Sequence, residues 1–279
     1  MLVEQAIQLL DRISGMDLNG ARILLTNDDG IHAHGIKVLE QIAREFTDDV
    51  WVCAPATEQS GKSHSLSLHG PIELFEHGPQ RFAVGGTPTD CVIVAMEHLF
   101  KDQNKPDVVL SGINMGSNLA EDVCYSGTVS AAVEATMMGV PSVAFSQRLN
   151  QGVANWDTPL TWGPAVLRRI GSVALPPNVL VSVNFPSRDP DEVKGVTVCP
   201  MGIGKSAGGL EARTSPRGQS YFWLGPMSNK IGVAPGADFD VVMSGGISVT
   251  PLQVERTYNP LLAPLETALT GTKAGESAR

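Results

Sequence analysis

The stretch Ile23-Leu24-Leu25-Thr26-Asn27-Asp28-Asp29-Gly30 joins an apolar run to two adjacent carboxylates near the start of the chain. Its apolar half predicts a short buried strand over residues 22–26. Two carboxylates at the end of such a strand are costly unless a cation neutralises them, and hard divalent ions prefer oxygen ligands. Asn, Asp and Gly are also the commonest turn-forming residues. By itself, therefore, the stretch indicates either an ion site or a turn.

The residues that follow predict a strand–helix–strand unit. Apolar side chains recur at helical spacing from residue 36 to 46, and a second apolar run over 50–54 stops at Pro55. This order predicts two parallel strands joined by a right-handed crossover. In such sheets, ligands bind outside the carboxyl ends of the strands. We therefore expect residues 27–30 and the loop 56–61 to open onto one edge of the sheet.

Further strands and helices extend this pattern into an α/β fold, a Rossmann-like and mostly parallel sheet flanked by helices. A helix over 91–100 is predicted to be capped by Thr89, with Asp90 in its first turn. Alternating residues predict an exposed hairpin within 65–74. The remaining predicted strands are 108–110, 141–145 and 178–183, and the remaining helices are 129–137 and 162–173.

Changes in composition and in predicted secondary structure divide the chain into four parts. Residues 1–20 form an N-terminal extension: either 1–15 are an extra amphipathic helix, or translation begins at Met16. Residues 21–195 form the catalytic core, and 265–279 a small, polar tail. Between them, 196–264 are expected to be a β-rich appendage with return strands that protrudes and swaps or pairs with another subunit. Its strand candidates are 196–199, 221–224 and 247–250.

Composition excludes several classes of protein. The 279 residues are 42% hydrophobic and 18% charged, as in a globular protein, and the net charge of −9 disfavours a protein that coats nucleic acid. The four cysteines are widely spaced and lack a CxxC motif, which disfavours zinc fingers and disulfide frameworks and favours a reducing compartment. With no apolar run of transmembrane length and no basic start like that of a signal peptide, we expect a cytoplasmic protein without membrane association.

Oxygen-bearing side chains recur where the predicted strands end. Asp28 and Asp29, Ser60, and Asn114 follow three different strands. The segment Ser126-Gly127-Thr128 opens a helix, and it provides either an ordinary N-cap or an anion site built from free backbone N–H groups. A hard metal ion beside an anion pocket is the arrangement used for phosphoryl hydrolysis.

Several motifs, in order and spacing, resemble the SurE family of survival-protein nucleotidases across nearly the whole chain apart from residues 1–20 and the tail. The motifs are Leu24-Leu25-Thr26-Asn27-Asp28-Asp29-Gly30-Ile31, Ala54-Pro55 with Gln59-Ser60-Gly61, Gly86-Thr87-Pro88-Thr89-Asp90-Cys91, Ser111-Gly112-Ile113-Asn114 with Ser126-Gly127-Thr128-Val129, and Gly246-Ile247-Ser248-Val249-Thr250-Pro251-Leu252.

The resemblance implies a metal-dependent 5′- and 3′-nucleotidase that hydrolyses nucleoside monophosphates, with a Rossmann-like core and a β-hairpin that builds a homodimer or homotetramer. It implies Mg²⁺ or Mn²⁺ held by Asp28, Asp29, Ser60 and Asn114. Asp28 and Asp29 are the expected catalytic residues, with either water or an Asp as nucleophile. The expected phosphate or substrate contacts are Asn27, Asn114, Ser126, Gly127 and Thr128. No nucleic-acid polymer is expected as a partner.

The chain departs from the family pattern at two loop positions. Family members often have Ala-Pro-Gly where this chain has Ala33-His34-Gly35, and Asp at the position of Ala56. Neither change touches an expected ligand. Lys62 and His64, near Ser60, are either phosphate contacts or an ordinary surface lysine and packed histidine.

Three other classes of protein share some of these features with a nucleotidase. A Rossmann oxidoreductase would need a GxGxxG motif after the first strand, and that motif is missing. A haloacid-dehalogenase-type phosphatase would have Asp-x-Asp, whereas Asp28 and Asp29 are adjacent. A non-catalytic nucleotide or metal sensor stays open as the alternative function.

Overall fold

The structure is a computed structural model that describes residues 15–229 and 234–270, and it is built on one large mixed sheet. The sheet has nine strands in the order β10-β13-β9-β6-β5-β1-β2-β4-β3. Six neighbouring strands, from β9 to β4, run parallel, whereas β13 and β3 pair antiparallel with β9 and β4. The nine strands are β1 (Ile23–Thr26), β2 (Val50–Pro55), β3 (Leu74–Glu76), β4 (Arg81–Val84), β5 (Val108–Met115), β6 (Ser142–Gln147), β9 (Val179–Phe185), β10 (Val196–Val198) and β13 (Ile247–Gln253).

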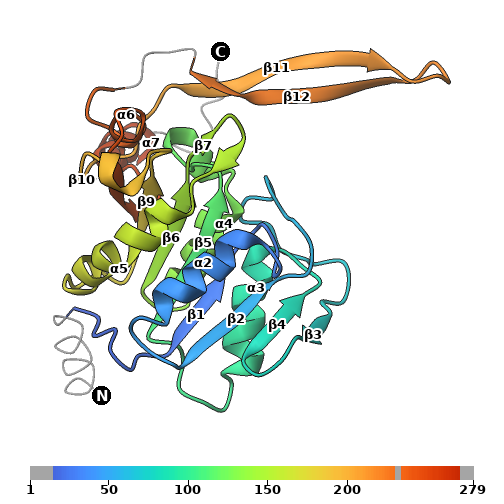
Figure 1. The fold of residues 1–279 in the computed structure, drawn as a ribbon. Coiled ribbons are helices and arrows are strands. Elements are labelled where there is room, and N and C mark those ends of the chain that lie inside the picture. The colour runs from blue at the N-terminus through green and yellow to red at the C-terminus, as the bar shows by residue number, and fades with distance from the viewer. Residues whose placement is uncertain (1–14, 230–233, 271–279) are drawn as a thin grey trace.

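Helices cover both faces of this sheet (Figure 1), as the expected Rossmann-like arrangement requires. Because neighbouring side chains in a strand point to opposite faces, Leu25 packs with α2 and α5 and Leu24 with α3 and α4. The helices are α2 (His34–Ala43), α3 (Pro88–Val94), which continues as the π-helical turn η1 (Ala95–Leu99), α4 (Gly127–Met137), α5 (Asp157–Gly171), α6 (Asp238–Met243) and α7 (Leu262–Thr270), with 3-10 turns η2 (Ala120–Cys124), η3 (Pro190–Glu192) and η4 (Asn259–Leu261).

Three local expectations were wrong. The hairpin forms between β3 and β4, not within 65–74, because β4 pairs with β2 and thereby gains a place in the sheet. The cap of α3 is Thr87, not Thr89: its hydroxyl accepts from the Asp90 N–H, and the Asp90 carboxylate accepts from the Thr87 N–H at 2.8 Å. Strand β5 continues to Met115, so Asn114 lies within a strand rather than in a loop after it.

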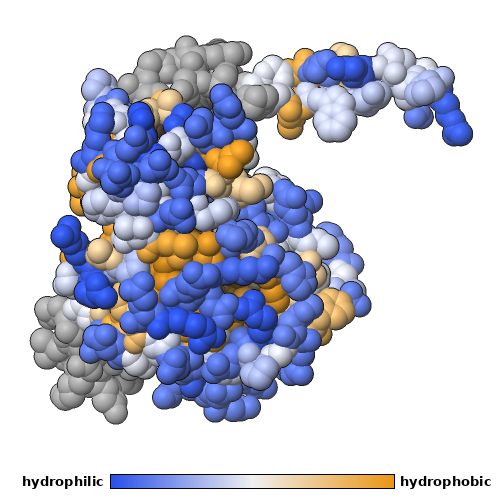
Figure 2. All heavy atoms as spheres, viewed as in Figure 1, coloured by the Kyte–Doolittle hydropathy of each residue, from blue (hydrophilic) through white to orange (hydrophobic). Residues whose placement is uncertain are grey.

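Beyond residue 195, part of the chain returns to the sheet and part leaves it. β10 and β13 join the edge next to β9, whereas β11 (Lys205–Thr214) and β12 (Ser220–Asn229) form a long two-stranded hairpin that projects from the body (Figures 1 and 2). A smaller hairpin, β7 (Leu149–Asn150) with β8 (Val153–Ala154), follows β6. Helices α6 and α7 were not expected, because α6 has only six residues and Pro264 interrupts the pattern of α7. The expected tail begins inside α7.

The sequence also led to expectations about residues 1–15 and about membrane-spanning segments. The alternatives for residues 1–15 fall almost entirely outside the described residues, which begin at Gly15. Among the helices within 15–229 and 234–270, none combines the length and the apolar character that crossing a bilayer requires.

Candidate active site

Asp28 lies at the carboxyl end of β1, where it meets the start of α4. Its side chain is buried, with 4% of its surface exposed. The Thr128 hydroxyl donates a hydrogen bond to Asp28 Oδ1 although the two residues are a hundred positions apart. Burial raises the pKa of Asp28, and hydrogen bonds from Thr128 and Gly127 oppose that rise. The site therefore holds a carboxylate that is poorly solvated but well oriented.

Asp29 faces the end of β5. Its Oδ2 accepts a hydrogen bond from the Met115 N–H at 3.0 Å. Burial raises the pKa of Asp29 to about 6, opposed by that hydrogen bond and reinforced by the negative charges of Asp28 and Glu58. Neither Asp28 nor Asp29 forms an ion pair with any residue that the structure describes. Two adjacent carboxylates are thus partly buried together, and no cationic side chain of the described residues pairs with them.

The stretch 27–30 also forms a turn, as its residue types allowed, and Asn27 closes it. This fully buried side chain accepts from the Gly30 N–H at 3.2 Å and donates to the Gly30 carbonyl at 2.9 Å. Gly30 has a φ of +97°, a conformation that favours glycine. The amide of Asn27 is therefore used in closing the turn that presents Asp28 and Asp29.

Asn114 and Ser60 reach the same place from β5 and from the loop after β2. Asn114 donates from Nδ2 to the Gly116 carbonyl at 2.9 Å, which leaves Oδ1 without a hydrogen-bond partner among the described residues. The Ser60 hydroxyl donates to Glu58 Oε1 at 2.9 Å. The loop that carries Ser60 is tied down by Gln59, whose N–H donates to the Asp28 carbonyl at 2.8 Å. Oxygen atoms from three strand ends thus converge.

The N-terminus of α4 completes the arrangement. Ser126 is its N-cap, and its hydroxyl accepts from the Val129 N–H at 3.0 Å. Gly127 lies so close to Asp28 that a Cβ at this position would be 2.8 Å from Asp28 Cβ and 3.1 Å from Pro88 Cγ. The cap interpretation is therefore correct, and the same helix end lies against Asp28.

A cavity of about 430 Å³ joins four of these residues, whereas Asp29 and Gly127 are not part of its lining. Asp28, Ser60, Asn114 and Ser126 line it, whereas Thr128 lies behind Asp28. Several lining residues were missed by the sequence analysis, although the repeated Asn and Ser after Asn114 were a signal for two of them. The missed residues are Gly61, Met115, Ser117, Asn118, Asp122, Tyr125, Leu224 and Gly225, the last two from β12.

His64 and Lys62 do not line this cavity. His64 Nε2 lies 2.7 Å from Glu134 Oε2 on α4, so it packs against the helix rather than facing the carboxylates. Its neighbour Ser63 donates from Oγ to the Cys124 carbonyl at 2.7 Å. These contacts fasten the loop of Ser60 to the segment before α4, which is a structural role.

No group of three or more His, Cys, Asp or Glu side chains suited to a metal ion occurs in the described part of the chain. A metal at the candidate site would therefore have two carboxylates, a serine hydroxyl and an amide oxygen as protein ligands. That set is typical of Mg²⁺ or Mn²⁺, which keep several waters and need few carboxylates, and not of zinc.

Comparison with known proteins identifies the family. The model of the family described as "Survival protein SurE" matches residues 23–207. The chain belongs to the SurE family. A protein named 5′-nucleotidase SurE from Rhodopseudomonas palustris (strain BisB18) is 48% identical over 257 residues, which cover 89% of this chain and 99% of that protein. Its namesake from Caulobacter vibrioides (strain NA1000 / CB15N) is 46% identical over 255 residues, covering 90% and 97%.

A solved structure of the SurE family has the same fold. The crystal structure of the SurE protein from Aquifex aeolicus matches with a TM-score of 0.77 at 30% identity, covering 88% of this chain and 98% of that one. The family membership and the α/β fold predicted from the sequence are thereby confirmed.

Proposed function

We propose that this SurE-family chain is a metal-dependent phosphatase that hydrolyses nucleoside monophosphates to nucleoside and phosphate. The observation that carries the proposal is the carboxylate pair Asp28 and Asp29, which has no ion-pair partner among the described residues. Asp28 lies against the N-terminus of α4 and lines the cavity. The match to relatives named 5′-nucleotidase over nearly their full length supports the choice of substrate. Both 5′- and 3′-monophosphates are proposed as substrates.

In this proposal Mg²⁺ or Mn²⁺ is held by Asp28, Asp29, Ser60 and Asn114. The residues fit such an ion: the carboxylates lack ion-pair partners, and Asn114 Oδ1 has no hydrogen bond among the described residues. When bound, a hard divalent ion neutralises phosphate oxygens and makes water a better nucleophile. Thr128 keeps the Asp28 carboxylate in one orientation by donating to Oδ1.

The substrate phosphate is proposed to rest against Ser126, Gly127 and Thr128. The first N–H groups of an eleven-residue helix are without helical partners and lie at the positive end of its dipole, which favours an anion. Gly127 leaves room beside Asp28 where any side chain would intrude. The chain therefore binds and orients the phosphate next to the carboxylates, while the buried surroundings exclude water from the hydrogen bonds around Asp28.

Complete removal of metal is expected to abolish phosphate release, because without the ion the two carboxylates repel the phosphate. The measurement is inorganic phosphate released from a panel of 5′- and 3′-nucleoside monophosphates, first after EDTA treatment and gel filtration and then after adding Mg²⁺ or Mn²⁺. Activity that survives metal removal would overturn the metal requirement. No release from any phosphoester with metal present would favour the sensor.

We also propose that the chain works as a homodimer or homotetramer in the cytoplasm, with the β11–β12 hairpin at a subunit contact. Registered pairs place Leu210, Ala212, Phe222 and Leu224 on one face of the hairpin, where the three large side chains are 57–79% exposed. A protruding apolar face of this kind favours association. Free cysteines, three of them buried, support a reducing compartment.

Replacing two residues of that apolar face, Leu210→Ser with Phe222→Ser, is expected to reduce the mass in solution to that of a smaller species. The control is Glu211→Ser, which changes the opposite face of the same hairpin. Light scattering after gel filtration measures the mass of all three proteins. A wild-type monomer at working concentration, or an unchanged mass in the double variant, would contradict this use of the hairpin.

A further inference from the structure

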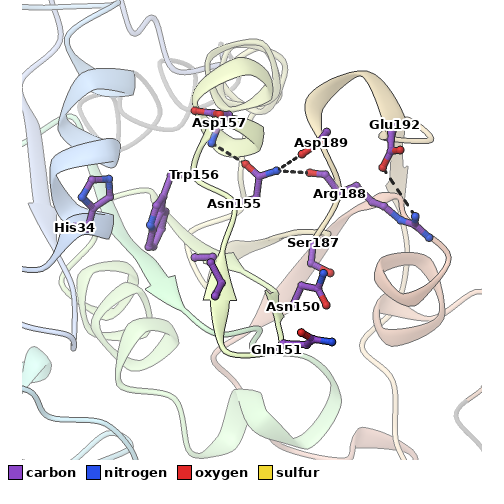
Figure 3. A pocket seen from close by; sticks show the side chains of 12 residues that line it. His34, Asn150, Gln151, Asn155, Trp156, Asp157, Ser187, Arg188, Asp189 and Glu192 are labelled. Carbon is purple, nitrogen blue, oxygen red and sulfur yellow. Dashed lines mark hydrogen bonds and ion pairs between the residues drawn. The ribbon is translucent and has the colours of Figure 1, made fainter.

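A second cavity, of about 930 Å³, lies at the same edge of the sheet but shares no lining residue with the candidate active site. Its walls come from His34 at the start of α2, the β7–β8 hairpin, the segment that leads into α5, and the loop 187–192 after β9. Figure 3 shows His34 and Trp156 on one side of it and Ser187 and Arg188 on the other, with Asn155 between them.

Hydrogen bonds hold the walls of this cavity in place. Asn155 donates to the Arg188 carbonyl at 3.2 Å and to Asp189 Oδ1 at 2.7 Å, while its own Oδ1 accepts from the Asp157 N–H at 3.2 Å. Thr158 donates to the same Arg188 carbonyl. The start of α5 and the loop after β9 are therefore tied together, so the cavity is a built feature of the fold.

An aromatic surface and side chains without hydrogen bonds to other described residues line this cavity. The ring of Trp156, half-buried, lies 5.3 Å from that of His34 between centroids. Within the described residues the Trp156 indole N–H has no hydrogen-bond acceptor, and the side chains of Asn150 and Gln151 have no hydrogen bonds. Planar rings stack on such aromatic surfaces, and side-chain amides both donate and accept hydrogen bonds.

The charges around the cavity disfavour a phosphate. Asp157, Asp189 and Glu192 outnumber Arg188, whose Nη1 is 4.0 Å from Glu192 Oε2. An organic cation would satisfy the carboxylates but would leave the indole and amide donors unpaired. A ligand that is uncharged, planar in part, and provided with both donors and acceptors satisfies all of these groups.

We propose that this cavity binds a nucleoside, with the base against Trp156 and His34 and the ribose hydroxyls near Asn150 and Gln151. The identification of the ligand as a nucleoside rests on the proposed function, since a nucleoside is both its product and the uncharged part of its substrate. The aromatic pair adjoins the active-site strand. A Cβ on Gly35 would lie 1.9 Å from the Ile113 carbonyl oxygen and 3.3 Å from the Trp156 ring, and Asn114 follows directly.

Binding of free nucleosides is the direct test. Calorimetry with adenosine, guanosine and cytidine is carried out in EDTA, where hydrolysis plays no part, so failure of the proposed phosphatase activity leaves this result interpretable. We expect binding by wild type and a weakening of about tenfold in Trp156→Leu, as base stacking predicts. His34→Ala should also weaken binding, whereas His69→Ala, at an exposed histidine away from the cavity, should not.

Inhibition kinetics then show whether the cavity binds the nucleoside part of the substrate or the free nucleoside product. Competitive inhibition by nucleoside, with a raised KM in Trp156→Leu, would mean that the cavity receives the base of the substrate. Non-competitive inhibition with an unchanged KM would mean a separate product site. The proposal is overturned if no nucleoside binds wild type, if folded Trp156→Leu and His34→Ala both bind as wild type does, or if spermidine binds and nucleosides do not.

Discussion

Replacing Asp28 by asparagine is expected to reduce turnover by at least about 100-fold while leaving the fold intact. Loss of a partner behind a metal ligand alone typically costs 10–100-fold, so loss of a ligand's charge should cost at least the upper end of that range. Asparagine preserves the shape of Asp28, and its Oδ1 still accepts from the Thr128 hydroxyl. Phosphate release from a nucleoside monophosphate, with Mg²⁺ or Mn²⁺ present, measures the loss.

The same substitution should stabilise the protein when metal is absent. Burial raises the pKa of Asp28 in the folded state above its unfolded value of 3.8. A carboxyl with a raised folded pKa contributes stability below the unfolded pKa, and this is lost as the pH rises through the folded pKa. At pH 8, well above the unfolded pKa, Asp28 therefore destabilises the metal-free fold, and asparagine removes that cost.

Thermal melting at pH 8 checks both parts of this expectation. In EDTA, Asp28→Asn should melt above wild type. With metal at 100 times its Kd, wild type should gain about 2.7 kcal/mol and the variant much less. Asp191→Asn, at an exposed carboxylate, is the control and should match wild type throughout. Wild-type turnover in Asp28→Asn would show that the first loop has been assigned the wrong role.

The edge of the sheet that carries the site could be predicted because the signals for it are local. Each parallel strand is a short apolar run that ends in polar residues, and parallel strands end at a common edge. Asp28, Ser60, Asn114 and Ser126 were each placed at such an end, and all four line one cavity in the structure. Convergence follows from topology alone.

Contacts that depend on the exact path of the chain could not be predicted. The hydroxyl of Thr128 donates to Asp28, a partner one hundred residues away that the sequence did not indicate. For Asn27 two roles were open, shaping the turn or contacting the substrate, and in the structure its side-chain amide closes the turn. Leu224 reaches the cavity from the β11–β12 hairpin, and the direction of a hairpin that leaves the sheet is not encoded in its alternation.

Predictions from local sequence patterns were wrong where two neighbouring segments or residues fitted the same pattern. Alternating residues within 65–74 suggested a hairpin, but Ser67 instead donates from its hydroxyl to buried Asp90 at 2.6 Å. Thr87 and Thr89 are both good caps by residue type, and Thr87 is preferred because Asp90 lies three positions after it, which permits the reciprocal capping box. The three-residue spacing between Thr87 and Asp90 therefore determines where α3 begins.

Replacing Gly127 by alanine is the second change with a large expected effect. The added Cβ would lie 2.8 Å from Asp28 Cβ, closer than real Cβ atoms come to another atom, and 3.0 Å from Asp28 Oδ2. Asp28 is buried and hydrogen-bonded, so it cannot move aside without losing Thr128. We expect turnover to fall by about 100-fold, because a shift of about 1 Å in a reacting group costs that much.

Gly127 is not among the glycines with a positive φ, so the effect of alanine there is one of space and not of backbone strain. Gly70→Ala is the matched control, since Gly70 also has an ordinary φ and nothing lies within 4 Å of its added Cβ. Gly127→Ala should bind metal more weakly in calorimetry and lose activity, whereas Gly70→Ala should keep both. If Gly127→Ala retained wild-type turnover, the phosphate would not rest at this end of α4, and the close approach of Gly127 to Asp28 would be a packing feature only.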